Sequence, residues 1–411
     1  MADTENIIIN PLKLLRQKDF ACIWCSIFFT GLANFTEQFV AIWLVLELTS
    51  DSPWSLFLGG AITFVRLGFA PLSILSGAIA DKVSRKLLVT TMQWIAGLLG
   101  LLVAVLIFLD ILELWHLFVI VCLSGLSRIF EMPTAQALAS DSVETAHITR
   151  AMALVNGGRN LSMLLGLFLA GVLFDTFGPQ GTFMVIFFFY GVAGVAPLLM
   201  KTKNPLSNNP TESILKSIWG GFKYVKSNQI LWAALLVAAL INVSGFTFHQ
   251  TLLPMFAKVV IESSATKASM LMATFAVGAF VGSIVLSSLA RNRNQGWTLI
   301  LSVIAWHSMM ILFSMIQIYI VWVLILLAAG FFWASTLIQI QSLLLGKSDP
   351  SYRGRIQGLR TLAIYPHAVS AALSGLMAGI FGVSHVVMFN GALGILFMLA
   401  VIIIAPKLRN I

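Results

Sequence analysis

The sequence predicts an all-α membrane protein with twelve transmembrane helices in two six-helix halves. Three observations predict this fold: the composition, the spacing of apolar runs and the placement of basic residues. Of the 411 residues, 59% are hydrophobic and 10% are charged, and the mean hydropathy is +0.94. Soluble domains carry roughly 25% charged residues. A chain this apolar requires lipid as its solvent.

Twelve apolar runs are long enough to cross a bilayer, which takes about 20 residues per helix. The first six lie near 20–48, 54–79, 87–109, 115–139, 151–174 and 180–200. The second six lie near 230–256, 268–290, 297–317, 319–345, 357–381 and 385–405. Most of the polar segments between them are short. We expect 51–53 and 178–180 to be loops on the outer side of the membrane.

The basic residues alternate between the two sides of the predicted helices. The terminal segments and every second loop hold 20 of the 25 Lys and Arg, whereas the intervening loops hold only Lys258 and Lys267. Basic residues are retained on the cytoplasmic side of membrane proteins. The net charge of +9 therefore reports topology and contact with the lipid bilayer, and it does not indicate nucleic acid as a partner. It predicts a multi-pass inner (cytoplasmic) membrane protein with both termini in the cytoplasm.

A longer polar segment divides the chain into an N-terminal half at 1–200, a linker at 201–229 and a C-terminal half at 230–411. The linker begins rich in Pro and Asn, and its remainder has apolar residues at helical spacing among lysines. This pattern predicts an amphipathic helix on the cytoplasmic surface. The halves also repeat, since Asp81 and Arg291 are 210 positions apart, as are Arg150 and Arg360. Two parallel repeats with a site at their midplane interface are typical of secondary transporters.

The loop between the second and third runs carries a glycine, an aspartate four positions later and a basic cluster: Gly77, Asp81, Lys82, Arg85 and Lys86. It resembles the hallmark loop of the major facilitator superfamily, with Ser84 where a glycine is usual. The resemblance implies the major facilitator fold and a gating loop. We expect Gly77 to permit close helix packing, Asp81 to pair with a neighbouring helix end, and Arg85 and Lys86 to anchor at the lipid surface. In the alternative interpretation, the basic residues only set topology.

Five further stretches narrow the resemblance: 132–138, 151–156, 224–228, 253–257 and 352–358. Together they resemble the enterobactin-exporter-like branch of the superfamily, over nearly the whole chain. That branch implies proton-driven export of amphipathic small molecules, siderophores among them.

The fifth run resembles the glycine-rich helix that proton-coupled exporters often carry, and its glycines predict close packing against a neighbouring helix. These residues are Gly157, Gly158, Gly166 and Gly171. Leu167 stands where that pattern has a proline. The motif that would indicate export is therefore incomplete.

Five charged residues lie inside the first-half runs: Glu37, Arg66, Arg128, Glu131 and Arg159. Each costs about 2.5–3.5 kcal/mol at the bilayer centre on insertion scales, which indicates a functional role. We expect Glu37 and Glu131 to be the proton-coupling residues, because burial favours the neutral form of a carboxyl group. A structural alternative is that Arg128 and Glu131, three positions apart on one helix face, neutralise each other.

The second half contributes neutral polar residues, and its only acidic residue between 230 and 345 is Glu262, in an outer loop. Proton coupling is therefore assigned to the first half. The predicted substrate cavity combines both halves. Its residues are Asn34, Gln38, Arg66, Arg128, Arg159, His249, Gln339, Gln341 and Tyr365.

These observations predict a secondary transporter that exports an amphipathic small molecule, siderophore or drug-like, in exchange for protons by alternating access. An importer or a lysophospholipid flippase of the same fold is one alternative, and a receptor or scaffold without flux is another. The sequence lacks a phosphate-binding loop with a lysine and a His/Glu metal spacing. We therefore expect no enzyme activity, no cofactor and no metal, and we expect a monomer.

Overall fold

The computed structural model describes residues 11–69, 72, 83–144, 147–201, 214–288, 294–349 and 352–410, and these residues are helical without a β-strand. The first half contains the 3-10 helix η1 (Pro11–Arg16), α1 (Lys18–Leu48), α2 (Ser55–Leu67), α4 (Arg85–Phe108), α5 (Leu114–Asp141) and α6 (Ile148–Leu198).

The surface helix α7 (Ile214–Lys226) leads into the second half. That half contains α8 (Gln229–Val243), α9 (Gly245–Thr247), the π-helical turn η4 (Phe248–Leu252), α10 (Leu253–Val259), α11 (Ala265–Ser288), α12 (Gln295–Met315), α13 (Tyr319–Gly346), α14 (Arg353–Leu362), α15 (Pro366–Phe381), α16 (Val383–Ile404) and the 3-10 helix η6 (Pro406–Asn410).

The described helices match the twelve expected apolar runs. Ten of them are long and apolar enough to cross a membrane, and α2 is a shorter apolar helix. One of the ten, α6, contains two runs, because Gly178 interrupts it with φ +68° and ψ 178°. Pro179 follows at once, and its ring suits the first position of a helix. Gly178 therefore turns the chain without the loop that we expected at 178–180.

Two other runs are less regular than the sequence predicts. The run expected at 230–256 is divided into α8, α9, the π-turn η4 and α10, and it ends at Val259. The run expected at 357–381 breaks between α14 and α15, where Pro366 begins the second helix. Proline has no backbone N–H to donate and favours a first-turn position. Hydropathy alone does not report such breaks.

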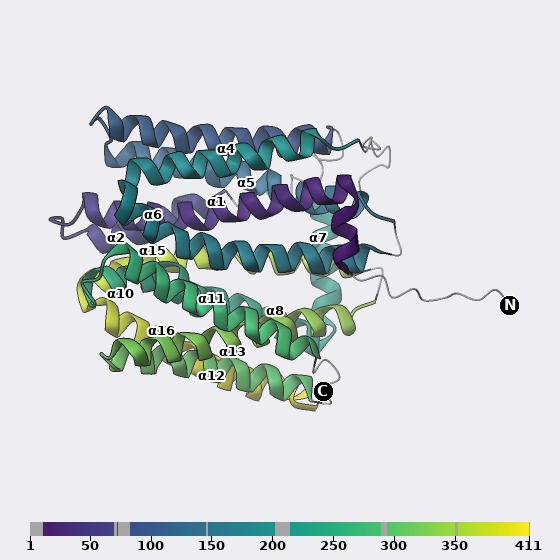
Figure 1. Cartoon of the computed structure of the whole chain (residues 1–411). Helices are drawn as coiled ribbons and strands as arrows, with labels where there is room; N and C mark the ends of the chain where they lie inside the picture. The colour runs from purple at the N-terminus through teal and green to yellow at the C-terminus, as the bar shows by residue number, and fades with distance from the viewer. Residues whose placement is uncertain are drawn as a thin grey trace.

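Both chain ends lie at the same end of the bundle (Figure 1). We call this the terminal end, and we call the opposite end, with the α1–α2 and α15–α16 connections, the far end. In the first half α1 and α4 pack against α6, and α5 packs against α4; in the second half α13 packs between α11 and α12, and α12 against α16. The halves meet through α2 against α15, α6 against α11 and α1 against α10.

Glycines allow the helices of the two halves to approach closely toward the far end. A methyl group on Gly60 of α2 would collide with the Ala371 carbonyl oxygen of α15 and lie 3.2 Å from the Gly375 Cα. A methyl group on Gly171 of α6 would collide with Ala265, at the start of α11. Backbones in contact at small residues are a common means of helix association in membranes.

Polar contacts join the halves at the same end. The Lys258 ammonium lies 4.0 Å from Oε1 of Glu47 and 4.6 Å from the centre of the Trp43 ring. The backbone N–H of Thr266 donates to the Asp175 carboxylate at 2.8 Å. Together with the glycine contacts, these interactions close the far end of the interface.

The linker helix α7 packs against α14 of the second half. The rings of Tyr224 and Tyr352 stack with centroids 4.1 Å apart, and the backbone N–H of Asp349 donates to the Tyr224 hydroxyl at 3.0 Å. Trp219 and Phe222 of α7 stay exposed. The amphipathic helix expected in the linker is therefore present, and it is fastened to the second half.

Candidate functional site

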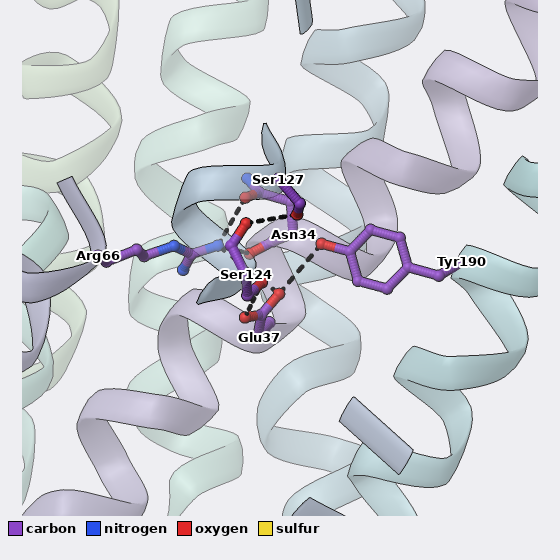
Figure 2. A network of polar contacts seen from close by, with 6 residues as sticks. All are labelled: Asn34, Glu37, Arg66, Ser124, Ser127 and Tyr190. Atoms are coloured by element: carbon purple, nitrogen blue, oxygen red, sulfur yellow. Dashed lines mark hydrogen bonds and ion pairs between the residues drawn. The ribbon is translucent and has the colours of Figure 1, made fainter. Parts of the chain in front are cut away.

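Glu37, in the middle of α1, is at the centre of a polar network inside the first half (Figure 2). Only 5% of the residue is exposed. The Ser124 hydroxyl of α5 donates to Oε1 at 2.7 Å, and the Tyr190 hydroxyl of α6 donates to Oε2 at 3.0 Å. Nη2 of Arg66, from α2, lies 3.8 Å from Oε2. Four helices of this half therefore meet at one carboxylate.

Arg66 connects Glu37 to the next turn of α1. Its Nη2 donates to the Asn34 side-chain oxygen at 2.6 Å and to the Asn34 carbonyl oxygen at 3.4 Å. The close approach of α2 to α5 depends on Gly125, because a methyl group there would collide with the Arg66 carbonyl oxygen. This contact fixes the depth at which the guanidinium enters the network.

Glu131 belongs to a second, neighbouring cluster. It is 5% exposed, and Nε2 of Gln93 lies 3.5 Å from its Oε1. The same amide group lies 2.8 Å from the hydroxyls of Ser26 and Thr30. Among the described residues no ion pair joins Glu131 to Arg128. The two side chains still interact electrostatically, so a structural pair on α5 stays an alternative interpretation.

Two guanidinium groups retain unused hydrogen-bonding capacity. Nη1 of Arg66 and Nη1 of Arg128 are buried and have no hydrogen-bond partner in the described part of the chain. Buried polar atoms are normally paired, and an arginine offers donors only. These atoms suit an acceptor such as a carboxylate or a water molecule. Arg159, the third predicted cation, lies on α6 near its start.

One polar contact between the halves joins two side-chain amides. Nε2 of Gln38, on α1, donates to Oε1 of Gln250, in η4, at 3.1 Å. Next to Gln250, the His249 ring stacks on Phe275 with centroids 4.6 Å apart and contacts the Gly245 carbonyl oxygen at 3.3 Å. The structure thus brings the predicted residues Gln38 and His249 to the interface between the halves.

Three predicted cavity residues are placed elsewhere. Gln341 accepts a hydrogen bond from Arg360 of α14, and Gln339 is buried within α13. Tyr365 lines a cavity of about 680 Å³ among α8, α15 and α16, together with residues such as Val369 and Phe389. None of these three contacts the Glu37 network through a described hydrogen bond.

The predicted gating loop is described only in part, because Gly77, Asp81 and Lys82 lie outside the described residues. Arg85 donates to the Asp141 carboxylate at 2.6 Å, which joins α4 to α5.

Lys86 donates to the carbonyl oxygens of Leu198 and Met200, both at 2.8 Å. The Arg85 and Lys86 side chains thus bond to neighbouring helices, and their role as lipid-surface anchors stays a prediction. Unpaired carbonyls and partial negative charge at the end of α6 suit a lysine.

Sequence reasoning missed Ser124, Tyr190 and Gln93, all of them neutral polar residues within apolar runs. One signal was available, since Tyr190 is the single tyrosine of the first 200 residues and lies in the middle of a run. The glycines of the fifth run behave largely as expected. Gly158 and Gly166 pack against α1 and Gly171 against α11, whereas Gly157 faces open space.

Comparisons with known proteins place this architecture in a family. The family model described as Major Facilitator Superfamily matches residues 23–365. The enterobactin exporter EntS of Citrobacter koseri is 24% identical over 355 residues, covering 82% of this chain and 80% of the relative. The same protein of Shigella flexneri is 25% identical over 355 residues, with 82% and 79% covered.

Two solved structures share the fold at 12% identity. A bacterial homolog of the human lysosomal transporter Spinster, inward-facing and unoccupied, gives a TM-score of 0.71 over 95% of this chain and 96% of that one. An auto-inhibited POT family peptide transporter gives 0.74 over 95% and 97%. The multi-pass helical bundle, its two halves and the matching family model agree. The chain belongs to the major facilitator superfamily of membrane transporters, and its sequence is similar to the enterobactin exporters.

Proposed function

We propose that this secondary transporter exports an amphipathic, anionic small molecule in exchange for protons, by alternating access. The main observation behind this proposal is the environment of the buried Glu37 carboxylate. It is surrounded by one guanidinium group and two hydroxyl groups, which come from three other helices. Hydrogen-bond donors and a cation thus surround the charge of a carboxylate in this position. We assign the coupling proton to this carboxyl group.

Arg66 provides the link between substrate and proton. It holds Asn34 and faces Glu37 with one nitrogen, while its other terminal nitrogen is buried and unpaired. An anionic substrate that binds this nitrogen competes with Glu37 for the guanidinium. Loss of the cation favours proton uptake by Glu37, and proton release draws Arg66 back and displaces the substrate. Glu131, with Arg128 beside it on α5, is the second carboxyl group available to such a cycle.

The charge distribution supports an orientation in the membrane, and the relatives support a direction of transport. The terminal end carries the basic segments, which supports a cytoplasmic location for it in a bacterial inner membrane. The described contacts between the halves lie in the middle and at the far end, which fits an inward-facing conformation. The Citrobacter koseri and Shigella flexneri relatives are named as exporters, and export is accordingly the direction that we propose.

The test uses the full chain in proteoliposomes with enterobactin as the probe, since the named relatives export it. Glu37→Gln removes the ionisable group and keeps the size and hydrogen-bonding capacity of the side chain. We expect this variant to lose accumulation driven by a pH gradient and to retain exchange of labelled for unlabelled probe. The size of the cavity is almost unchanged, which is why exchange should survive.

Glu131→Gln is the matched comparison, because it removes an equally buried carboxylate. If Glu37→Gln keeps pH-driven accumulation and Glu131→Gln loses it, Glu131 is the coupling residue. If both variants keep it, proton coupling through the first half is wrong. If all of these charges can be neutralised without any effect on flux or binding, the receptor or scaffold alternative gains support.

A further inference from the structure

Six aromatic rings from six helical segments of the second half form one cluster that includes Phe246. We call this group the aromatic pocket: Phe246, His249, Phe275, Trp306, Trp333 and His367. The Phe246 centroid lies 5.2 Å from that of His249, 5.8 Å from Trp333, 6.2 Å from His367 and 6.5 Å from Trp306. Phe275 completes the group, 5.7 Å from Trp333. Rings at these separations and tilts present both faces and edges to a further ring.

The aromatic pocket has unused hydrogen-bonding groups of both kinds. The indole N–H groups of Trp306 and Trp333 are buried without an acceptor among the described residues. Oδ1 of Asn242, on the adjoining helix α8, is buried without a donor, while its Nδ2 donates to the Ala238 carbonyl oxygen at 2.7 Å. Asn242 is 5% exposed and Trp306 is fully buried. Unpaired buried donors and acceptors are costly, and a polar ligand group or a water molecule would satisfy them.

Buried side chains near the aromatic pocket, in contrast, have hydrogen-bond partners. His307, which follows Trp306, contacts the Ser244 hydroxyl at 2.8 Å and the Val303 carbonyl oxygen at 2.8 Å. Trp322, on the same helix as Trp333, donates to the Phe313 carbonyl oxygen at 3.0 Å. Buried histidine and tryptophan side chains of this half therefore find partners outside the aromatic pocket. This contrast indicates that the unpaired groups mark a place for a ligand.

The aromatic pocket is located where the substrate of the proposed function would reach it. Phe246 and Trp333 are only partly buried. Gln250, one turn after Phe246, bonds to Gln38 of the first half. In the first half, Nη1 of Arg66 and Nη1 of Arg128 are buried without a partner among the described residues. The two halves thus differ in chemistry, with cations in one and neutral aromatic rings in the other.

We propose that the aromatic pocket binds an aromatic ring that carries a hydroxyl group, while the cations of the first half bind an anionic group of the same molecule. The ring packs beside Phe246 and Trp333. Its hydroxyl accepts from the indole N–H of Trp333, which is less buried than Trp306, and donates to Asn242. This inference rests on the proposed function for the cationic wall, and it specifies the substrate class as a hydroxylated aromatic acid.

The experiment measures binding to the purified full chain in lipid nanodiscs by saturation-transfer NMR, without any pH gradient. Three probes separate the contributions: 4-hydroxybenzoate, benzoate and cyclohexanecarboxylate. We expect affinity to fall in that order, by about 2- to 10-fold at each step, which corresponds to one hydrogen bond and one aromatic contact. Equal affinities for the three probes would overturn the proposal.

Variants of the aromatic pocket test which residues cause the preferences for the hydroxyl group and for the ring. Trp333→Phe keeps a ring and removes the N–H, so we expect it to lose the preference for the hydroxyl and keep that for the ring. Phe246→Leu removes the central ring and should lose the ring preference. Trp322→Phe is the matched control, because its N–H is already satisfied within the protein. A hydroxyl preference that survives in Trp333→Phe shows that water alone occupies the unpaired groups, which contradicts the proposal.

The two proposals fail in different ways. Glu37→Gln removes the competitor for Arg66 and should change the affinity for all three carboxylate probes by the same factor, so it should leave their order unchanged. If pH-driven transport proves independent of Glu37 while the probe preferences hold, the coupling proposal is wrong and the aromatic pocket stands. If transport depends on Glu37 and the probes bind equally, the substrate class is wrong.

Discussion

Replacing Gly60 by alanine should open the far end of the transporter. In the structure a methyl group at this position collides with the Ala371 carbonyl oxygen and lies 3.2 Å from the Gly375 Cα. Overpacking of this kind costs about 1–3 kcal/mol. The cost applies only while α2 and α15 are in contact. We therefore expect the ratio of far-end-open to far-end-closed molecules to rise by roughly 5- to 150-fold.

This packing should outweigh the ion pair at the same end. The Lys258 and Glu47 side chains are 28% and 50% exposed and 4.0 Å apart, and exposed ion pairs contribute about 0–1 kcal/mol. Closure of the far end thus depends mainly on glycine packing. Gly157→Ala is the matched control, because this glycine is also helical but has nothing within 4 Å of the added methyl group. Both changes gain a similar helix propensity, about 1 kcal/mol.

The assay is pulsed electron paramagnetic resonance between spin labels at Ser52 and Ser263, in the α1–α2 and α10–α11 connections. The native residues Cys22, Cys25 and Cys122 are first replaced by serine. Gly60→Ala should transfer population to a longer label separation, and Gly157→Ala should not. If folded Gly60→Ala protein gives the same distance distribution as Gly157→Ala, glycine packing does not control the far end.

Three further predictions concern topology, the gating loop and α4. Cysteines introduced at Ser207 and Lys347 should react with an impermeant maleimide only from the cytoplasm. Lys347 is chosen because it is exposed, whereas its neighbour Ser348 is buried. Labelling from outside would change the number of helices between the two positions. Asp81→Asn should slow transport strongly at normal membrane levels, and wild-type flux would leave that loop a topological role only. Lys86→Met should lower the midpoint of thermal unfolding, measured by tryptophan fluorescence, by a few degrees, because two hydrogen bonds to carbonyl oxygens are lost. Lys13→Met, at an exposed position, is the control and should leave the midpoint unchanged.

Hydropathy and the alternation of basic residues were sufficient to predict the fold. Apolar length is a direct requirement of the bilayer, so runs such as 20–48 became α1 with bounds shifted by at most two residues. The irregular positions were not predictable in this way. Gly178 continues into helix on both sides, and the π-turn at Phe248–Leu252 depends on packing between helices. Neither changes the hydropathy of its segment.

The candidate site was predicted through its charges and missed in its neutral members. A charge inside an apolar run is conspicuous, which identified Glu37 and Arg66. Ser124 and Tyr190 are ordinary residues of apolar helices, 87 and 153 positions from Glu37. Their role follows only from the packing of α5 and α6 beside α1. The same reason explains Gln341, whose polarity suggested the cavity but whose partner is Arg360.

The attachment of α7 to the second half shortens the connection between the halves. Because Tyr224 and Tyr352 stack, α7 belongs with the second half. The connection between the halves is then only 202–213, a length of chain that can reach at most about 40 Å when fully extended. A tether of this length maintains an effective concentration of one half near the other in the millimolar range. The far-end contacts therefore need not be strong enough to hold two separate molecules together. They can be weak enough to break in every cycle, and the tether returns the same partner each time.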